Sequence, residues 1–372
     1  MKIKLDKTEL NLATNRSQGA ISDRALAHIG LRANLDKLQV MVADRVLVIY
    51  STLEAEIEAE GGVFVPARLF SDVVRQLPEG KVTLESDNQF LTIKAGKSDE
   101  FIMKLPIIAD KQWKEPPELD SKNEADLPSE NLFYMIEQVQ FCVANESPRN
   151  YGAVGFLHKP ESEKIRLVGT DGFRLSYSEI DIPLPDAFLG NGVCLSKRGL
   201  NELQRMCGEG FDTIRLSISE DQTTFFAAVP NYKIFIRLSA VKYPNYQGVL
   251  PKTNLVPVHI SRPYLQSVTR RVLLAADKTR ALQLCFSDSS LTLRSRTLGS
   301  SEGKESIALK DYQGGEQELA INGKFLTDVF STISSEEVSL RFRSENDPIV
   351  LIPRSEPEDC HSMHVLVPIR ES

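Results

Sequence analysis

The segment Gly299–Glu305 is the part of the chain that comes closest to a nucleotide-binding loop. It reads G-S-S-E-G-K-E. A phosphate-binding loop has four residues between its glycines, then a lysine, then a serine or threonine whose hydroxyl binds magnesium. Here three residues separate Gly299 from Gly303, and Glu305 stands where the hydroxyl residue should be. The segment therefore favours a hairpin turn over a phosphate site.

Two other places could carry chemistry, namely the pair His361 and His364, and Asp171. The histidines are three residues apart in a strand-like stretch, which puts them on opposite faces of a strand and argues against a shared metal ion. Asp171 lies in a T-D-G sequence, a common tight-turn composition, with no partnered base near it in the sequence. We predict no catalytic residue, no metal site and no cofactor, and therefore a protein that is not an enzyme.

The composition is that of an ordinary globular protein with two or three domains. The chain has 372 residues, of which 41% are hydrophobic and 26% charged. Its apolar runs fall short of the roughly 20 residues of a membrane span, and no signal-peptide core follows Met1, so we expect a cytoplasmic protein. The five cysteines form no C-x-x-C pair, which favours buried thiols. With a net charge of −7, any DNA binding must depend on where the basic residues lie.

The elements that would position a site follow a threefold repeat of one helix followed by strands. The three copies begin near Val65, Leu195 and Ile321. Their helices carry apolar residues at the spacing of one helix face. These series are Phe70, Val73, Val74 and Leu77; Leu200, Leu203 and Cys207; and Leu326, Val329, Phe330 and Ile333. A second helix is expected before each of these, at Leu132–Val139, at Leu265–Val272 and, more weakly, at Leu5–Ala20.

The charged residues of the first set of helices repeat as well. Each helix has a basic residue near its start and an acidic residue four positions later, which fits an exposed helix face. The pairs are Arg68 with Asp72, Arg198 with Glu202, and Lys324 with Asp328.

Alternating apolar and polar residues predict strands after each helix. They are Lys81–Leu84, Phe90–Ile93 and Phe101–Pro106; Thr213–Ile218, Thr223–Ala228 and Ile234–Leu238; and Val338–Phe342, Ile349–Ile352 and His364–Pro368. The predicted fold class is α+β, with three similar domains that each have two helices and antiparallel sheets. Proline-bearing stretches at Lys114–Glu130 and Tyr243–Pro257 are interpreted as linkers, which places the domains at residues 1–120, 121–251 and 252–372.

Three segments, in order along the chain, resemble the bacterial DNA polymerase III beta subunit, the DNA sliding clamp. Val168–Leu175 contains T-D-G-F-R-L, similar to the family's T-D-G-H-R-L. Tyr243–Pro251 is similar to its F-P-D-Y-x-x-V-L-P, and Val365–Arg370 to its V-V-M-P-M-R. The resemblance runs from end to end and implies a head-to-tail homodimer whose six domains close a ring around DNA. Such a ring confers processivity on the replicative polymerase.

The resemblance implies sequence-independent phosphate contacts from helices that line the ring. The candidate residues for binding double-stranded DNA are Arg24, Arg68, Arg75, Arg149, Tyr151, Lys197, Arg198, Arg205, Arg262, Arg270 and Lys324. Tyr151 lies where the family carries an aromatic residue that contacts DNA.

The resemblance also implies a groove that takes an extended segment of a partner protein. The matching positions are Thr170, Gly172, Phe173, Arg174, Leu175, Pro244, Val249, Asn322, Phe325, Val365, Leu366, Val367, Pro368, Ile369 and Arg370. The matching dimer contacts are Phe101, Met103, Leu273 and Leu274, for which core packing is the rival interpretation. The chain departs from the family pattern at Gly152, Phe173, Gly248 and Thr279, which changes what the groove would prefer.

The partners implied are replicative and repair polymerases, a clamp loader and other proteins that carry a clamp-binding motif, with no membrane. Two other classes of protein fit a repeated α+β chain. One is a β-rich DNA-modifying or carbohydrate-active enzyme, which would need convergent carboxylates. The other is an adaptor that binds only proteins. Processivity that needs a loader and ATP, but no catalytic metal, separates a clamp from both.

Overall fold

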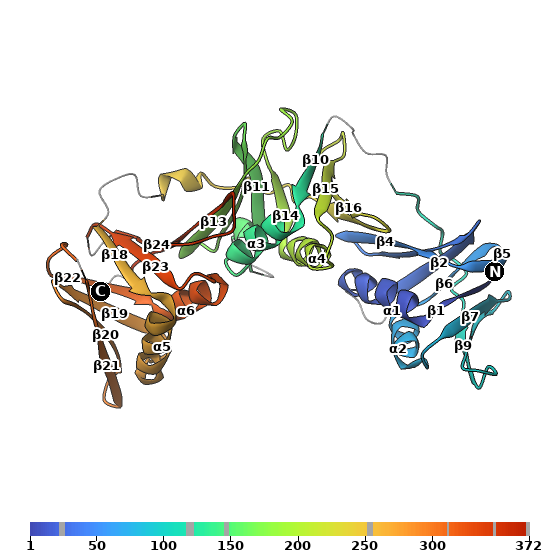
Figure 1. Ribbon diagram of the computed structural model, residues 1–372, viewed down its shortest axis with the longest axis horizontal. Helices are drawn as coiled ribbons and strands as arrows, with labels where there is room; N and C mark the ends of the chain where they lie inside the picture. Colours follow the sequence, from blue (N-terminus) through green and yellow to red (C-terminus); the bar gives the residue numbers. More distant parts are fainter. Residues whose placement is uncertain are drawn as a thin grey trace. The chain divides into compact units, whose positions relative to one another are not determined.

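The computed structural model describes residues 1–21, 27–116, 123–144, 149–250, 256–310, 312–344 and 347–369. The chain packs as two compact units (Figure 1). Unit 1 comprises Met1–Ser129 and Arg205–Leu238, and unit 2 comprises Glu130–Gln204 and Ser239–Ser372. Each unit has one eight-stranded antiparallel sheet and one smaller sheet. None of the described helices is long and apolar enough to cross a membrane.

Unit 1 is built from strands of the first and second repeats. Its eight-stranded sheet has the order β10 (Glu124–Pro128), β15 (Thr213–Ile218), β16 (Thr224–Val229), β17 (Tyr232–Arg237), β4 (Leu47–Glu54), β3 (Lys37–Ala43), β2 (His28–Asn34) and β6 (Gly61–Pro66). The five-stranded sheet has the order β5 (Glu56–Ala59), β1 (Lys2–Asp6), β7 (Lys81–Ser86), β8 (Phe90–Ala95) and β9 (Phe101–Pro106). Its helices are α1 (Lys7–Arg16), the 3-10 turn η1 (Ser17–Ala20) and α2 (Ala67–Gln76).

Unit 2 repeats this arrangement with strands of the second and third repeats. Its eight-stranded sheet has the order β14 (Val193–Ser196), β11 (Val154–Glu161), β12 (Lys164–Thr170), β13 (Arg174–Asp181), β25 (Cys360–Leu366), β24 (Ile349–Pro353), β23 (Glu337–Phe342) and β18 (Val256–Ser261). The four-stranded sheet has the order β21 (Ser301–Ala308), β20 (Ser290–Thr297), β19 (Ala281–Ser287) and β22 (Gln317–Asn322).

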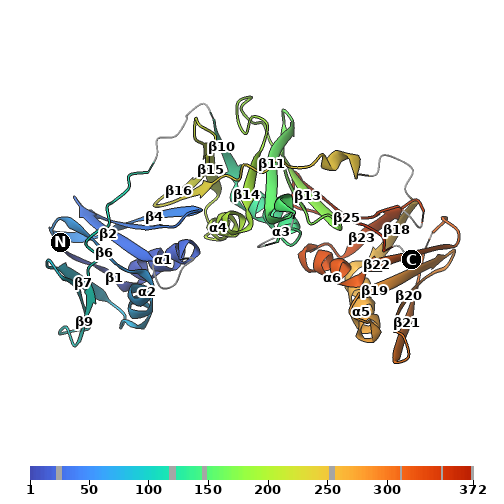
Figure 2. The same cartoon turned by 180° about the vertical axis from the view of Figure 1, so that it is seen from behind.

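The remaining helices are α3 (Ser129–Gln140), α4 (Lys197–Cys207), α5 (Arg262–Val272) and α6 (Gly323–Thr332), with 3-10 turns η2 (Asn150–Ala153), η3 (Tyr246–Gly248) and η4 (Leu273–Ala275). Helices α1 and α2 lie side by side in unit 1, and α5 and α6 do so in unit 2 (Figures 1 and 2). The predicted apolar face of α2 is confirmed, because Phe70 and Val74 are fully buried. In the third repeat, α5 and α6 share one core with strands of both sheets of unit 2.

The middle repeat is divided between the two units because its two sets of strands pair with different neighbours. Strand β17 pairs with β4 of the first repeat, with Val48 opposite Phe235. Strand β13 pairs with β25 of the third repeat, with Leu175 opposite Val365. Both pairings are antiparallel, and each makes a continuous sheet from two repeats.

Several sequence predictions are modified by the structure. Lys114–Glu130 is not a linker throughout, because β10 lies within it and buries Ala125 and Leu127 while pairing with β15. Only the first residues of Gly299–Glu305 form a turn, since β21 begins at Ser301. The predicted domain boundaries, near residues 120 and 251, lie outside the described residues.

The residues considered for chemistry are placed as follows. His361 is exposed and His364 is fully buried, so they lie on opposite faces of β25 as predicted. Within the described ranges, no group of three or more His, Cys, Asp or Glu side chains could hold a metal ion. The cysteines are free thiols, and all but Cys285 are buried.

Candidate functional site

Unit 2 has a hollow of about 210 Å³ at the junction between its second and third repeats. The hollow lies where β12 ends, β13 begins, β25 ends and the segment 244–249 passes over the sheet. Eight of the predicted groove residues line it: Thr170, Gly172, Arg174, Leu175, Pro244, Val249, Val365 and Val367. Residues far apart in the sequence are thus brought to one place.

The turn between β12 and β13 is fixed by its own side chains. The backbone N–H groups of Phe173 and Arg174 donate to Asp171 Oδ1 at 3.0 and 3.1 Å. Thr170 Oγ1 donates to the Arg174 carbonyl oxygen at 2.6 Å. Gly172 has a φ of +89°, which L side chains rarely adopt, and a Cβ there would overlap the Arg149 guanidinium. Asp171 is therefore a turn residue that caps backbone N–H groups, as its T-D-G setting predicted.

Arg174 connects this turn to the third repeat. Its Nε donates to Asp171 Oδ2 at 2.9 Å, and its Nη1 donates to Asp328 Oδ2 on α6 at 2.7 Å. Its guanidinium also lies 4.4 Å from the centre of the Phe325 ring. The side chain is 11% exposed, so its charge is held by partners and not by water. Arg174 therefore positions the groove and joins two repeats at the same time.

Tyr246 lines the hollow and is 5% exposed, and it was not among the residues predicted from the sequence. Its hydroxyl lies 2.8 Å from His158 Nε2 and accepts a hydrogen bond from Arg166 Nη1 at 2.8 Å. Arg166 is in turn ion-paired with Glu179. Burial, then the nearby Arg166 charge, lowers the pKa of His158 to about 4, so this imidazole is neutral at pH 7. The second aromatic of the Y-P-N-Y segment was the available signal, but its partners come from distant strands.

Other predicted groove residues lie beside the hollow and do not line it. Leu366 is 1% exposed and packs in the core of the third repeat, because strand alternation turns it away from Val365 and Val367. Asn322 caps α6 by accepting from the Lys324 N–H at 2.9 Å. Phe173 is 58% exposed at the turn, and Phe325 contacts Arg174. Pro368 and Ile369 follow β25 outside the hollow, and Arg370 lies outside the described residues.

Two residues predicted to contact DNA also line the groove. Arg149 and Tyr151 stand at its rim, and the Arg149 guanidinium lies 5.5 Å from the centre of the Phe173 ring. They could therefore contact a peptide as well as a phosphate. Asn245 is the remaining lining residue, and no sequence signal singled it out.

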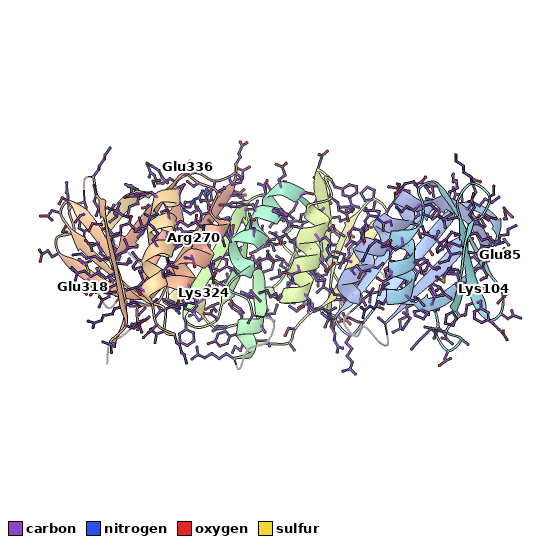
Figure 3. The ribbon with its side chains drawn as sticks, turned by 90° about the horizontal axis from the view of Figure 1, so that it is seen from below. Glu85, Lys104, Arg270, Glu318, Lys324 and Glu336 are labelled. Atoms are coloured by element: carbon purple, nitrogen blue, oxygen red, sulfur yellow. The ribbon has the colours of Figure 1, made fainter. Side chains whose placement is uncertain are left out.

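The other predicted DNA-binding cations are carried by helices. Arg68 and Arg75 on α2 both lie 3.9 Å from Asp72, and the Lys324 Nζ on α6 lies 2.9 Å from Asp328. Figure 3 labels Lys324 on α6 and Arg270 on α5, both in unit 2. These side chains are exposed, as are Arg205 on α4 and Arg270. The helices thus present cations to solvent from the face opposite their buried apolar residues.

Three of the predicted cations are less accessible. Lys197 and Arg198 at the start of α4 are half-buried, and burial, then the Arg174 charge, lowers the pKa of Lys197. Arg262 is half-buried and donates to the Ser335 carbonyl oxygen at 3.2 Å. Arg24 lies outside the described residues.

The predicted dimer contacts divide into exposed and buried side chains. Phe101 and Met103 are on β9, an edge strand of the five-stranded sheet, and Met103 is 38% exposed. Leu274 is 86% exposed, whereas Leu273 is 8% exposed and packs in the core of the third repeat. Core packing thus accounts for Leu273, and Leu274 is the member of that pair that could meet another chain.

Comparison with known proteins gives a consistent answer along the whole chain. Models of the DNA polymerase III beta subunit match in order, the N-terminal domain at residues 1–112, the central domain at 126–245 and the C-terminal domain at 247–370. The beta sliding clamps of Proteus mirabilis and Escherichia coli K12 are 28% and 26% identical, with full coverage of both chains.

Solved structures show the same fold. The DNA polymerase sliding clamp from Pseudomonas aeruginosa superposes with a TM-score of 0.90 at 22% identity, and the beta clamp of Caulobacter crescentus with 0.88 at 24%, each over the full length of both chains. Since three domain models of one subunit follow one another over nearly all of the sequence, the chain belongs to the DNA polymerase III beta subunit family.

Proposed function

We propose that this chain is a DNA sliding clamp, a processivity factor and not an enzyme, of which two copies close a ring around duplex DNA. The observation that carries the proposal is the ordered match of three clamp domains from residue 1 to residue 370. Exposed cations on helices at equivalent repeat positions support it, because Arg68 and Lys324 would meet phosphates without reading sequence. We also propose the domain division at 1–120, 121–251 and 252–372.

Topological linkage supplies the residence time that weak phosphate contacts cannot supply. The test loads the protein with a bacterial clamp loader and ATP onto nicked circular DNA, and then raises the salt. A protein held by phosphate contacts alone would lose about a thousandfold or more in affinity between about 50 and 200 mM salt. We expect retention on the circle and release after linearisation. Equal loss from both templates would contradict encirclement.

The dimer contact is proposed at β9 and Leu274. An edge strand leaves unpaired N–H and C=O groups that a second chain can cover, and Phe101, Met103 and Leu274 add apolar surface. The proposed partners through the groove are replicative and repair polymerases and the clamp loader. A protein that acts on the bacterial chromosome would be found in the cytoplasm.

The groove of unit 2 is proposed to take an extended segment with apolar side chains. Val249 and Val367 line it and are 45% and 39% exposed, so changing them should not destabilise the fold. Val249→Asp with Val367→Asp should abolish binding of a labelled polymerase-tail peptide, measured by fluorescence anisotropy. The matched control is Leu298→Asp, which changes a leucine that is 85% exposed elsewhere. Undiminished affinity of the double variant would show that the peptide binds somewhere else.

A further inference from the structure

Unit 1 has a hollow of about 380 Å³ that none of the site predictions includes. It lies at the junction of β4 and β17, where the first repeat meets the second. Its floor is made by Val48, Tyr50 and Phe235, and its rim carries Arg45, Lys114 and Arg237. The internal repeat gives this hollow a counterpart, the groove of unit 2.

The two hollows lie at equivalent strand pairs. In unit 1, Val48 stands opposite Phe235, and in unit 2, Leu175 stands opposite Val365. In each case, the residue two positions after Phe235 or Val365 donates its N–H back to the turn. Arg237 donates to the Val46 carbonyl oxygen at 2.8 Å, and Val367 donates to the Phe173 carbonyl oxygen at 3.1 Å.

The turns that precede the first strand of each pair are also equivalent. Asp44 Oδ1 accepts from the N–H groups of Val46 and Leu47 at 2.7 and 2.8 Å. Asp171 Oδ1 does the same for the second and third residues after it, at 3.0 and 3.1 Å. The hydrogen bonds therefore align Asp44 with Asp171 residue by residue, and the two hollows have a common backbone frame.

Apolar side chains form the floor of both hollows. In unit 1, Tyr50 is 8% exposed and Phe235 is 4% exposed, and their rings meet edge to face at 5.6 Å. The Tyr50 hydroxyl donates to the Lys114 carbonyl oxygen at 2.6 Å, which ties the segment after β9 over the sheet. In unit 2 the covering segment is also tied to the sheet, because the Tyr243 hydroxyl of that segment donates to the Val168 carbonyl oxygen on β12 at 3.2 Å. An apolar side chain could therefore be received in unit 1 as in unit 2.

The rims differ in charge. The alignment puts Arg45 where unit 2 has Gly172, and Arg237 where unit 2 has Val367. Both arginines are exposed, and in the described part of the chain no hydrogen bond or ion pair engages either guanidinium. The rim carboxylates are occupied, because Asp44 caps the turn and Glu115 pairs with Arg32. The rim is thus complementary to an acidic ligand.

We propose that this hollow is a second peptide-binding site, which takes an extended segment of a partner protein with an apolar anchor flanked by aspartates or glutamates. The apolar anchor fills the space over Tyr50 and Phe235, and the flanking carboxylates meet Arg45 and Arg237. The kind of ligand rests on the proposed role of the groove in unit 2, whereas the acidic preference rests on the rim of unit 1 alone.

The test uses a fluorescein-labelled hexapeptide whose central leucine and phenylalanine have a pair of glutamates on each side. Arg45→Glu with Arg237→Glu should weaken its binding about tenfold or more, because two attractions become repulsions. The control Arg296→Glu with Arg354→Glu makes the same charge change at exposed sites outside both hollows and should bind normally. Arg45→Gln with Arg237→Gln should give a smaller loss, which tests the site if the glutamate variant does not fold. A hexapeptide with lysine flanks should bind at least about tenfold more weakly than the acidic one.

The unit 2 variant Val249→Asp with Val367→Asp separates this proposal from the proposed groove. We expect it to bind the acidic hexapeptide normally while it loses the polymerase-tail peptide. If the Val249 and Val367 variant no longer binds the acidic hexapeptide while the Arg45 and Arg237 variants still bind it, the hexapeptide binds in the groove of unit 2. That result would support the groove of unit 2 and refute the second site. Absence of hexapeptide binding to the unchanged protein would also refute it. Binding that depends on Arg45 and Arg237 supports it even if the tail peptide fails to bind unit 2.

Discussion

Replacing Arg174 and Asp328 by alanine, singly and together, measures how strongly the second and third repeats are coupled in unit 2. The Arg174 Nη1 lies 2.7 Å from Asp328 Oδ2, and the two side chains are 11% and 24% exposed. Each has a second partner, Asp171 for Arg174 and Lys324 for Asp328. A double-mutant cycle isolates the Arg174–Asp328 interaction from these others.

The expected coupling follows from distance and burial. Two unit charges about 4 Å apart attract by about 4 kcal/mol at an effective dielectric constant of about 20. Desolvation of the partly buried guanidinium and carboxylate offsets much of this. We therefore expect a coupling free energy of about 1–3 kcal/mol. Arg174→Ala alone should cost about 3 kcal/mol, since it leaves the partly buried Asp171 carboxylate without its cation, whereas Asp328 keeps Lys324.

Urea unfolding provides the assay, followed by circular dichroism and by tryptophan fluorescence. The sequence has one tryptophan, Trp113, which belongs to unit 1. Its fluorescence transition should stay in place, while the dichroism transition moves to lower urea. The matched control is the pair Arg343 and Asp347, which has a 3.0 Å contact but an arginine that is 66% exposed. Its coupling should be below about 1 kcal/mol. Equal coupling in the two cycles would refute the argument from burial.

Three further predictions concern unit 2 and the proposed dimer. Burial, then the nearby Arg166 charge, lowers the folded-state pKa of His158 to about 4. Burial alone lowers the folded-state pKa of His364 to about 3. The stability that depends on their neutral form is therefore present above about pH 6.5 and is lost as the pH falls. Each histidine should lower the free energy of unfolding by about 2 kcal/mol between pH 7 and pH 5. An unchanged urea midpoint of unit 2 would contradict this. Gly172→Ala should lower the stability by about 1–2 kcal/mol and weaken peptide binding, because the φ of Gly172 is +89°. In the control Gly248→Ala the added Cβ meets open space, so neither the melting temperature nor the peptide anisotropy should change. Leu274→Asp, at a side chain that is 86% exposed, should give folded monomers in sedimentation, and an intact dimer would remove Leu274 from the proposed contact.

The sequence by itself determined the elements whose signals are local. The apolar periodicity of Phe70, Val73 and Val74 predicts α2, because the spacing of apolar residues within a helix marks the face that it buries. Strands such as Thr213–Ile218 were predicted with the bounds that the structure gives. Strand β10 was not predicted, because its proline and charges resemble a linker and its pairing partner, β15, is distant in the sequence.

The tertiary structure decided which side chains face outward together. Leu366 and Val367 are neighbours in the sequence, yet the pleat of β25 buries one in a core and leaves the other in the groove. Leu273 is buried and Leu274 is exposed in η4, the turn that follows α5. The split of the middle repeat between two sheets, and the second hollow that this split creates beside Phe235, depend on long-range strand pairing. No local pattern encodes such pairing, because it is set by which distant strand completes each sheet.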